Sequence, residues 1–199
     1  MREHVKDRID EIIGMIYESN IVTSFPTSSM LLLKYIDNCE WTDYRRLAEK
    51  NRTDIDGIAH YLGSRDGCTI YQRSRDRYLI AVNTDQHFPR LRWTTAHEFG
   101  HIFAGHFFEI EGQILQKQWY MEEEADYFAA SFLAPLPAIC MLRISSEKQL
   151  METFGLSKTA AALRWREYQE SGFGWKGRSA PRRVKPVNIW PEEGENWAL

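Results

Sequence analysis

The feature that most constrains this chain is a helical stretch, residues 94–104, that places two histidines and a glutamate among apolar residues. His97, Glu98 and His101 lie in it with the spacing His-Glu-x-x-His, in a chain that has only six histidines. An α-helix turns by about 100° per residue, so His97 and His101 lie roughly 40° apart, one turn from each other. Polar groups on one stripe of an apolar helix cost free energy when they are buried without partners. The two imidazoles can therefore bind one metal ion from a single helical face.

Glu98 supplies the second part of the pattern. It lies beside the face that the two histidines share, too poorly aimed to bind the ion but near enough to reach a water molecule at the metal. Zinc lowers the pKa of such a water towards 7, and a carboxylate can take its proton and pass it to a leaving amine. The spacing is typical of zinc hydrolases with Glu98 as catalytic acid and base. The same three residues also coincide by chance in on the order of one chain in a hundred.

A zinc site needs a third protein ligand, which the three residues of this motif do not supply. The metzincin pattern requires a glycine three residues after the second histidine and a further histidine three beyond that. Ala104 and Phe107 stand at those places, so that class is excluded. His106 would turn roughly 140° away from His101 on a continued helix, which favours capping of the helix end over metal binding.

A carboxylate from a second helix is the other option. Residues 121–133 are predicted to be helical, with a buried stripe of Ala125, Phe128, Ala129 and Phe132. Glu122 falls on the face of this stripe, Glu124 is the second choice, and Glu123 lies well off it. The alanines of the stripe favour close packing against the helix of the two histidines. Asp126, one turn after Glu122, either fixes the tautomer of a metal-binding histidine through its Nδ1 hydrogen or is a solvated helix residue.

The remaining pattern predicts an α+β fold, mostly helical, with a small sheet packed on the helix of the two histidines. Residues 68–73 and 77–82 are rich in β-branched and aromatic residues and form a predicted hairpin. Residues 83–93 are expected to be a loop that ends in a short edge strand. Either 77–82 or 88–93 is expected to hold an extended substrate by main-chain pairing. Further helices are predicted at 2–18, 29–36, 42–50, 55–62, 146–154 and 157–169.

Four segments are expected along the chain. Residues 1–50 form an N-terminal helical segment, and 51–140 form the core with the metal site. Residues 141–170 form a helix-turn-helix-like pair whose core is predicted to be Leu150, Phe154, Leu156, Ala160 and Leu163. Residues 171–199 are rich in Gly, Pro and basic residues, with an acidic end, and are predicted to be an extended tail.

Composition limits which partners and which cellular location are expected for the protein. A net charge of −3 gives no case for binding polyanions through bulk charge. No apolar run approaches the roughly 18 residues that span a bilayer, and the charged beginning MREHVKDRIDE is not a signal peptide. The three cysteines, Cys39, Cys68 and Cys140, are odd in number and lack metal-binding spacing. A cytoplasmic protein with reduced thiols and no membrane contact is expected.

Four segments resemble the ImmA/IrrE family of zinc metallopeptidases, in the family's order. The first is the predicted hairpin at 68–82, where the family has strands, and the others are FPRLRWTTAHEFGHIFAGHF, EEEADYFAASFLAP and LMETFGLSKTAAALRWREY. The resemblance implies a zincin-like fold in which His97, His101 and Glu122 bind Zn²⁺ and Glu98 is the catalytic residue. It further implies a protein substrate, since the family typically cleaves helix-turn-helix (Xre-like) repressors of phages, mobile elements or stress regulons. Cleavage of the repressor derepresses its genes.

Two other functions stay open at this point. The pair at 141–170 has a shape shared with DNA-binding helix pairs, although a packed core that supports the peptidase is the stronger interpretation and direct contact with DNA is not expected. A zinc-stabilised regulator could also bind a repressor without cutting it. The presence of Glu98, which such a regulator would not need, favours the enzyme. Candidate donors for the oxyanion of the reaction are Tyr127, Tyr120, His106 and Arg92.

Overall fold

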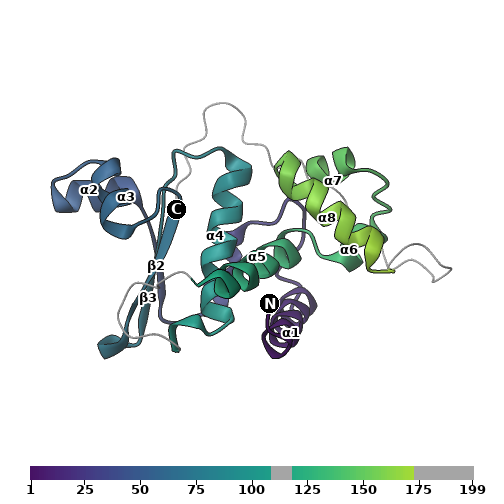
Figure 1. Cartoon of the computed structure of the whole chain (residues 1–199), viewed down its shortest axis with the longest axis horizontal. Helices are drawn as coiled ribbons and strands as arrows, with labels where there is room; N and C mark the ends of the chain where they lie inside the picture. Colours follow the sequence, from purple (N-terminus) through teal and green to yellow (C-terminus); the bar gives the residue numbers. More distant parts are fainter. Residues whose placement is uncertain (109–117, 173–199) are drawn as a thin grey trace.

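The computed structural model describes residues 1–108 and 118–172, which form helices around a small β-sheet (Figure 1). In chain order the elements, with 3₁₀ helices marked η, are α1 (Glu3–Glu18), η1 (Ser29–Tyr35), β1 (Cys39–Asp43), α2 (Tyr44–Asn51), α3 (Ile55–Leu62), β2 (Gly67–Gln72), η2 (Arg73–Arg75), β3 (Arg77–Val82), α4 (Phe88–Phe103), η3 (His106–Phe108), α5 (Trp119–Leu133), α6 (Leu136–Met141), α7 (Glu147–Phe154) and α8 (Lys158–Glu170). The predicted α+β class is confirmed. The division into four segments stays a prediction, and the tail predicted at 171–199 lies outside the described residues from 173 onward.

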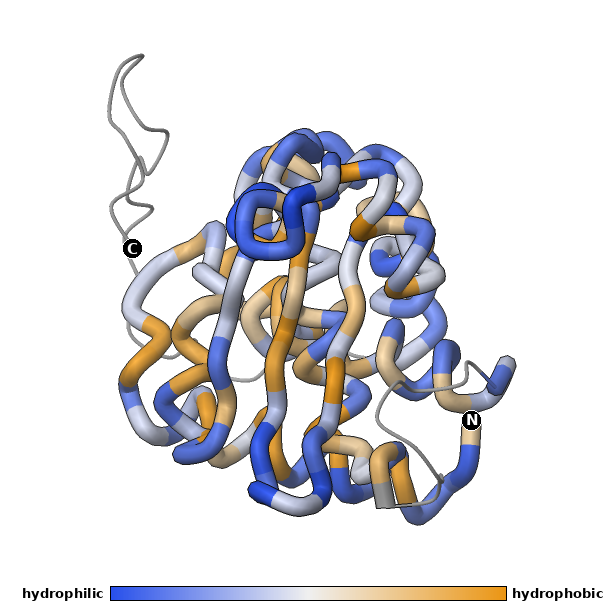
Figure 2. Tube along the Cα trace, turned by 90° about the vertical axis from the view of Figure 1, so that its left-hand side faces the viewer, coloured by the Kyte–Doolittle hydropathy of each residue, from blue (hydrophilic) through white to orange (hydrophobic). Residues whose placement is uncertain are grey.

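The sheet has the strand order β1-β3-β2. β2 and β3 form the predicted antiparallel hairpin, with Thr69 opposite Ile80, while β1 runs parallel to β3, with Trp41 opposite Ile80. Figure 2 looks onto the three strands, and the central strand β3 carries the most hydrophobic residues. Because β3 is paired on both sides, it cannot hold a substrate by its edge, and the expectation for residues 77–82 was wrong.

Three elements differ from the sequence-based expectation. Residues 39–43 form strand β1, a strand that the sequence did not predict; its last two residues belong to the helix expected at 42–50, which begins instead at Tyr44 because residues 39–43 pair with β3. Residues 88–93 are the first turns of α4, with Pro89 in the first turn, where proline needs no hydrogen-bond partner. They are therefore not an edge strand. Residues 136–141 form α6, with Pro137 in its first turn, where the sequence analysis predicted no helix.

Helices α4 and α5 cross in the middle of the molecule, and α4 also packs against β2 and β3 (Figure 1). Small residues make the crossing tight: a Cβ atom added to Gly100 would lie 2.9 Å from both the Cα and the carbonyl oxygen of Ala125. Ala96, Ala125 and Ala129 are fully buried. The predicted close packing of these helices is therefore confirmed, and it brings the side chains of α5 beside the histidines of α4.

Arg92 fastens the beginning of α4 to two distant segments. Its buried guanidinium donates hydrogen bonds to the carbonyl oxygen of Thr27 at 2.7 and 3.0 Å, and to those of Phe154 and Gly155 at 2.8 and 2.9 Å. Gly155 ends α7 with a φ of +61°, a conformation that favours glycine. The C-terminal helices are thus held to the core by main-chain acceptors.

The C-terminal pair α7–α8 buries much of the predicted core. Leu150, Phe154 and Leu156 are buried, but Leu163 is 57% exposed, so its assignment to the core was wrong. The neighbouring residue Arg164 is buried instead, because its Nε donates to the carbonyl oxygen of Ala134 at 2.8 Å. In the described ranges, no helix has both the length and the apolar character needed to cross a membrane.

Candidate metal centre

His97 and His101 project from one face of α4, as the i, i+4 spacing requires. Their Nε2 atoms lie 3.1 Å apart, and their ring planes are nearly perpendicular, at 84°. The side chain of His101 is 2% exposed and that of His97 is 12% exposed. The two nitrogens that could bind a metal thus lie side by side, with His97 on the more open side.

Glu122 of α5 completes a cluster of three possible ligands. Its Oε2 lies 3.5 Å from Nε2 of His97, and its Oε1 lies 3.3 Å from Nε2 of His101. Zinc ligands at about 2.0–2.1 Å in a tetrahedron lie about 3.3 Å from one another, so the three spacings fit a zinc-sized ion. In the part of the chain that the structure describes, this is the one cluster whose ligand atoms all lie within 4.8 Å of one another.

The charges of the cluster also suit a cation. Burial alone would raise the pKa of Glu122, but the contacts with His101 and His97 outweigh it and hold this pKa well below its usual range. Burial lowers the pKa of His101, and Glu122 offsets this effect only in part. Glu122 is therefore an anion and His101 a neutral imidazole, the protonation states that metal binding requires.

Asp126 lies behind His97, as the sequence suggested. Its Oδ1 is 2.8 Å from Nδ1 of His97 and also accepts a hydrogen bond from Nε1 of Trp93 at 3.3 Å. Burial lowers the pKa of His97, but Asp126 and Glu122 outweigh burial and raise it to about 9. The acceptor at Nδ1 leaves Nε2 directed at the cluster.

His106, Glu124 and Arg2 lie behind His101, an arrangement that sequence reasoning missed. The Nδ1 atoms of His106 and His101 are 2.8 Å apart, and Nε2 of His106 is 2.9 Å from Oε2 of Glu124. His106 and Glu124 are fully buried. Burial would raise the pKa of Glu124, but Arg2 lowers it to about 2, and burial lowers the pKa of His106 to about 4. Glu124, the second choice for a metal ligand, therefore contacts His106 and Arg2 instead.

Glu98 lies beside the two histidines on α4 and is buried. Its Oε2 accepts a hydrogen bond of 2.7 Å from Oγ1 of Thr69 on β2. Its negative charge acts on both His97 and His101, since it raises the pKa of each. A carboxylate that does not belong to the three-ligand cluster is thus held next to it by the edge strand of the sheet.

The comparison with protein families agrees with this geometry. The model of the IrrE N-terminal-like domain, Peptidase_M78, matches residues 50–166, more than half of the chain. The chain belongs to the ImmA/IrrE family of metallopeptidases. A search of curated proteins gave no match.

The matched region of this ImmA/IrrE peptidase runs from the end of α2 into α8. It contains β2, β3 and the two crossing helices of the candidate centre, so the predicted zincin-like fold is confirmed. Residues before 50, which include α1, Arg2 and β1, lie outside the match. The contact of Arg2 with Glu124 therefore joins a residue outside the matched region to one inside it.

Three of the four expected oxyanion donors are engaged elsewhere. Arg92 donates to main-chain carbonyls, and His106 lies between His101 and Glu124. The hydroxyl of Tyr127 donates to Asp10 of α1 at 2.5 Å. Tyr120, whose ring lies 4.7 Å from the guanidinium carbon of Arg2, is the candidate that these contacts leave open.

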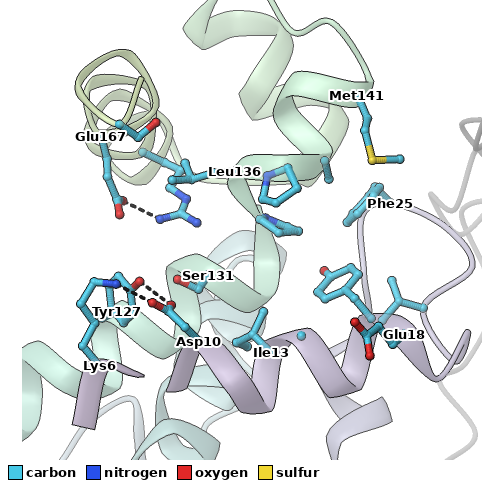
Figure 3. A pocket seen from close by; sticks show the side chains of 18 of the residues that line it. Lys6, Asp10, Ile13, Glu18, Phe25, Tyr127, Ser131, Leu136, Met141 and Glu167 are labelled. Carbon is cyan, nitrogen blue, oxygen red and sulfur yellow. Dashed lines mark hydrogen bonds and ion pairs between the residues drawn. The ribbon is translucent and has the colours of Figure 1, made fainter. Parts of the chain in front are cut away.

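A cavity of about 930 Å³ lies between α1, α5, α6 and α8 (Figure 3). Its walls are mostly apolar, for example Ile13, Phe25 and Leu136, and the contacts among Lys6, Asp10 and Tyr127 line one end. His97, His101 and Glu122 do not line it. The cavity and the candidate metal centre are thus different parts of the molecule that share helix α5.

Proposed function

We propose that this ImmA/IrrE peptidase is a zinc-dependent endopeptidase that cleaves a helix-turn-helix (Xre-like) repressor and so derepresses phage, mobile-element or stress genes. The observation that carries the hydrolase part is the cluster of His97, His101 and Glu122, with ligand atoms 3.1–3.5 Å apart and Glu98 on the same helix as the two histidines. The substrate class is supported by the resemblance to the family.

His97, His101 and Glu122 would hold the zinc ion. Two imidazole nitrogens and one carboxylate oxygen are a ligand set that zinc accepts, and three protein ligands leave a position for substrate, as in catalytic zinc sites. When bound, the ion acts as a Lewis acid that polarises a peptide carbonyl and makes water more acidic. Asp126 orients His97 by accepting a hydrogen bond from its Nδ1.

Glu98 is the proposed acid and base. Its carboxylate takes a proton from the attacking water and delivers it to the nitrogen of the leaving amine. Thr69 holds one oxygen of Glu98 by its 2.7 Å hydrogen bond, so the proton-carrying group has a fixed position relative to α4. Burial of Glu98 keeps bulk water from competing for this proton.

Strand β2 is the proposed substrate platform. It is an edge strand of the three-stranded sheet in the described part of the chain, and it carries Thr69, the partner of Glu98. An extended peptide can add to such an edge by main-chain hydrogen bonds. The scissile bond would then lie along the strand nearest to Glu98.

The proposed partner and location are supported by features outside the candidate metal centre. A peptidase acts on a protein, and the burial of Arg164 in the α7–α8 pair removes one of the cations that a DNA-binding helix would present. A cytoplasmic location is supported by the three cysteines, which are all free.

The test uses the purified chain, zinc and a helix-turn-helix repressor encoded by a neighbouring gene. Cleavage is followed on gels and the new termini are identified by mass spectrometry. We expect the wild-type chain to cut the repressor and Glu98→Gln to lose at least about 10²-fold in rate while it retains one zinc. Glu152→Gln, which changes an exposed glutamate of α7, should cut at the wild-type rate.

Two results would contradict the proposal. Cleavage by Glu98→Gln at the wild-type rate would remove Glu98 from the reaction. If the wild-type chain and Glu98→Gln both bind zinc and the repressor, but neither cuts it, the protein is a non-catalytic regulator. Loss of zinc from both His101→Ala and Glu122→Ala, but not from Glu152→Gln, would support the ligand assignment separately from the reaction.

A further inference from the structure

Arg2, Glu124 and His106 form a chain of hydrogen bonds that ends on His101. We propose that this chain holds His101 in the tautomer whose Nε2 lone pair faces the candidate metal site, and that Arg2 and His106 are positioning residues for metal binding. The inference rests on the ligand set of the proposed function. It adds residues that are not part of the three-ligand cluster, and Arg2 lies outside the region matched to the family.

The first step of the chain is set by Arg2. Its backbone N–H and its Nε donate to Oε1 of Glu124 at 2.9 and 3.0 Å, and its Nη2 donates to Oε2 at 2.9 Å. A guanidinium can only donate, so both oxygens of Glu124 act as acceptors. Glu124 is fully buried, and these three donors fix the position and orientation of its carboxylate.

The second step passes through His106. Its Nε2 lies 2.9 Å from Oε2 of Glu124, an oxygen that already accepts from Arg2, so Nε2 of His106 is the donor. A neutral imidazole carries one hydrogen, which leaves Nδ1 of His106 as an acceptor. That atom faces Nδ1 of His101 at 2.8 Å. Nδ1 of His101 therefore donates, and its Nε2 is bare.

The metal end of the chain requires the same arrangement. Nε2 of His101 is the atom that faces Glu122 at 3.3 Å and His97 at 3.1 Å, and it must carry a lone pair to bind an ion. The hydrogen of His101 must then lie on Nδ1, where His106 accepts it. The opposite direction of the chain would place a hydrogen on Nε2 and point it into the site. Both ends thus select one set of tautomers.

These hydrogen bonds link Arg2, near the N-terminus, to the candidate metal site on α4. Partners behind metal-binding histidines typically change metal affinity by 10–100-fold when they are removed. We expect Arg2→Met to weaken zinc binding by about 10-fold, and His106→Phe, which removes the acceptor itself, by up to about 100-fold. Arg2→Lys keeps the charge but not the forked donor, and should restore the affinity only in part.

The experiment measures zinc affinity by competition with a chelator and records the absorption spectrum of the Co²⁺ form for each full-length variant. Arg77→Met is the matched control, because Arg77 makes a 2.8 Å ion pair with Glu40 on the exposed side of the sheet. Denaturant unfolding without metal tests whether the variants still fold. Two-bond ¹H–¹⁵N couplings of the metal-free protein report the tautomer of each histidine, a property that a merely structural role would not change.

The expected result is weaker zinc binding and a changed Co²⁺ spectrum in Arg2→Met and His106→Phe, but not in Arg77→Met. In the wild-type chain His101 should carry its hydrogen on Nδ1 and His106 on Nε2. Equal affinity in Arg2→Met and Arg77→Met, or the opposite tautomer of His101 in the wild type, would overturn the inference and leave the proposed function standing. If the wild-type chain and Arg77→Met bind no zinc, the proposed function fails first and the inference fails with it.

Discussion

Oδ1 of Asp126 lies 2.8 Å from Nδ1 of His97, which joins the second helix of the candidate centre to the first histidine of the pair. His97 and His101 thus each have a partner at Nδ1, a carboxylate for one and an imidazole for the other. The partner of His97 is half-exposed and that of His101 is fully buried. Water can therefore reach the Nδ1 partner of His97 but not that of His101, although both histidines face the same site.

Replacement of Asp126 by Ala should weaken zinc binding by about 10-fold, at the low end of the usual range, because water can reach Nδ1 of His97 in its place. Zinc affinity is measured by competition with a chelator, and denaturant unfolding of the same preparations tests whether the variant folds. Glu152→Ala is the control, since Glu152 lies on α7 and faces Lys148. An unchanged affinity in Asp126→Ala would assign Asp126 to the solvated helix surface.

Zinc binding should release close to one proton per ion at pH 7. In the metal-free protein the pKa of His97 is about 9, above its ordinary value of 6.5, so His97 is protonated at pH 7 and must lose this proton to bind. His101 and Glu122 have no proton to lose, because their pKa values are lowered. Apparent affinity should then fall about tenfold for each pH unit below 9, until other ligands protonate.

Calorimetry in two buffers with different ionisation enthalpies measures this proton directly. In Asp126→Asn the pKa of His97 should be lower, because the strongest partner that raises it loses its charge, and fewer protons should be released at pH 7. A binding heat that does not depend on the buffer would show that His97 is neutral before zinc arrives.

Substitution of Thr69 by Val should slow repressor cleavage by about 10-fold with little change in zinc affinity. The change removes the 2.7 Å hydrogen bond to Glu98 and preserves the shape of the side chain. The buried carboxylate then lacks a donor, which costs about 1–3 kcal/mol. Thr69→Ser keeps the hydroxyl and should retain most of the activity. Equal kcat in Val and Ser variants would mean that Thr69 does not position Glu98.

Substitution of Gly100 by Ala should destabilise the fold by about 1–3 kcal/mol and weaken zinc binding, because the new methyl group would push α5 away from α4. Denaturant unfolding with and without zinc separates the two effects. Gly14→Ala is the control: Gly14 lies in α1 with nothing within 4 Å of its Cβ position, so alanine should stabilise the helix by about 0.5–1 kcal/mol. A neutral Gly100→Ala would contradict the tight crossing.

The sequence could predict the parts of the candidate site that depend on one helix at a time. The relation of His97 to His101 is fixed by helical periodicity, and the buried stripe of α5 favoured Glu122 over Glu123. Asp126 followed from its place one turn beyond Glu122. These features require only that each helix forms and that the two apolar faces meet.

The contacts of His106 and Arg2 could not be predicted in the same way. The helix was predicted to end near residue 104, and the direction of His106 was judged as if the helix continued. In the structure α4 ends at Phe103 and Gly105 adopts a φ of +79°, so the chain turns and brings His106 back to His101. Glycine at 105 was a usable signal for the end of the helix, although not for the direction of the turn. Arg2 is 122 residues from Glu124, and no local pattern encodes such a contact.

Strand β1 and the exposure of Leu163 show the same limit in the fold. β1 is a short, half-buried stretch that becomes a strand because β3 offers it a parallel partner. Leu163 has an apolar side chain on a helix whose buried positions are taken by Ala161 and Arg164. Which residue of a helix faces inward depended here on an acceptor from another segment, the carbonyl oxygen of Ala134.

The buried guanidinium of Arg92 has a consequence for the modularity of this peptidase. Two of the three residues whose carbonyls surround it, Phe154 and Gly155, come from the end of α7. A protein truncated ahead of Phe154 would keep the cation in its interior and lose those acceptors, which is strongly unfavourable. The C-terminal helices therefore cannot be removed without destabilising the core. Engineers who transplant the catalytic scaffold into another protein would have to carry α7 with it or replace Arg92 first.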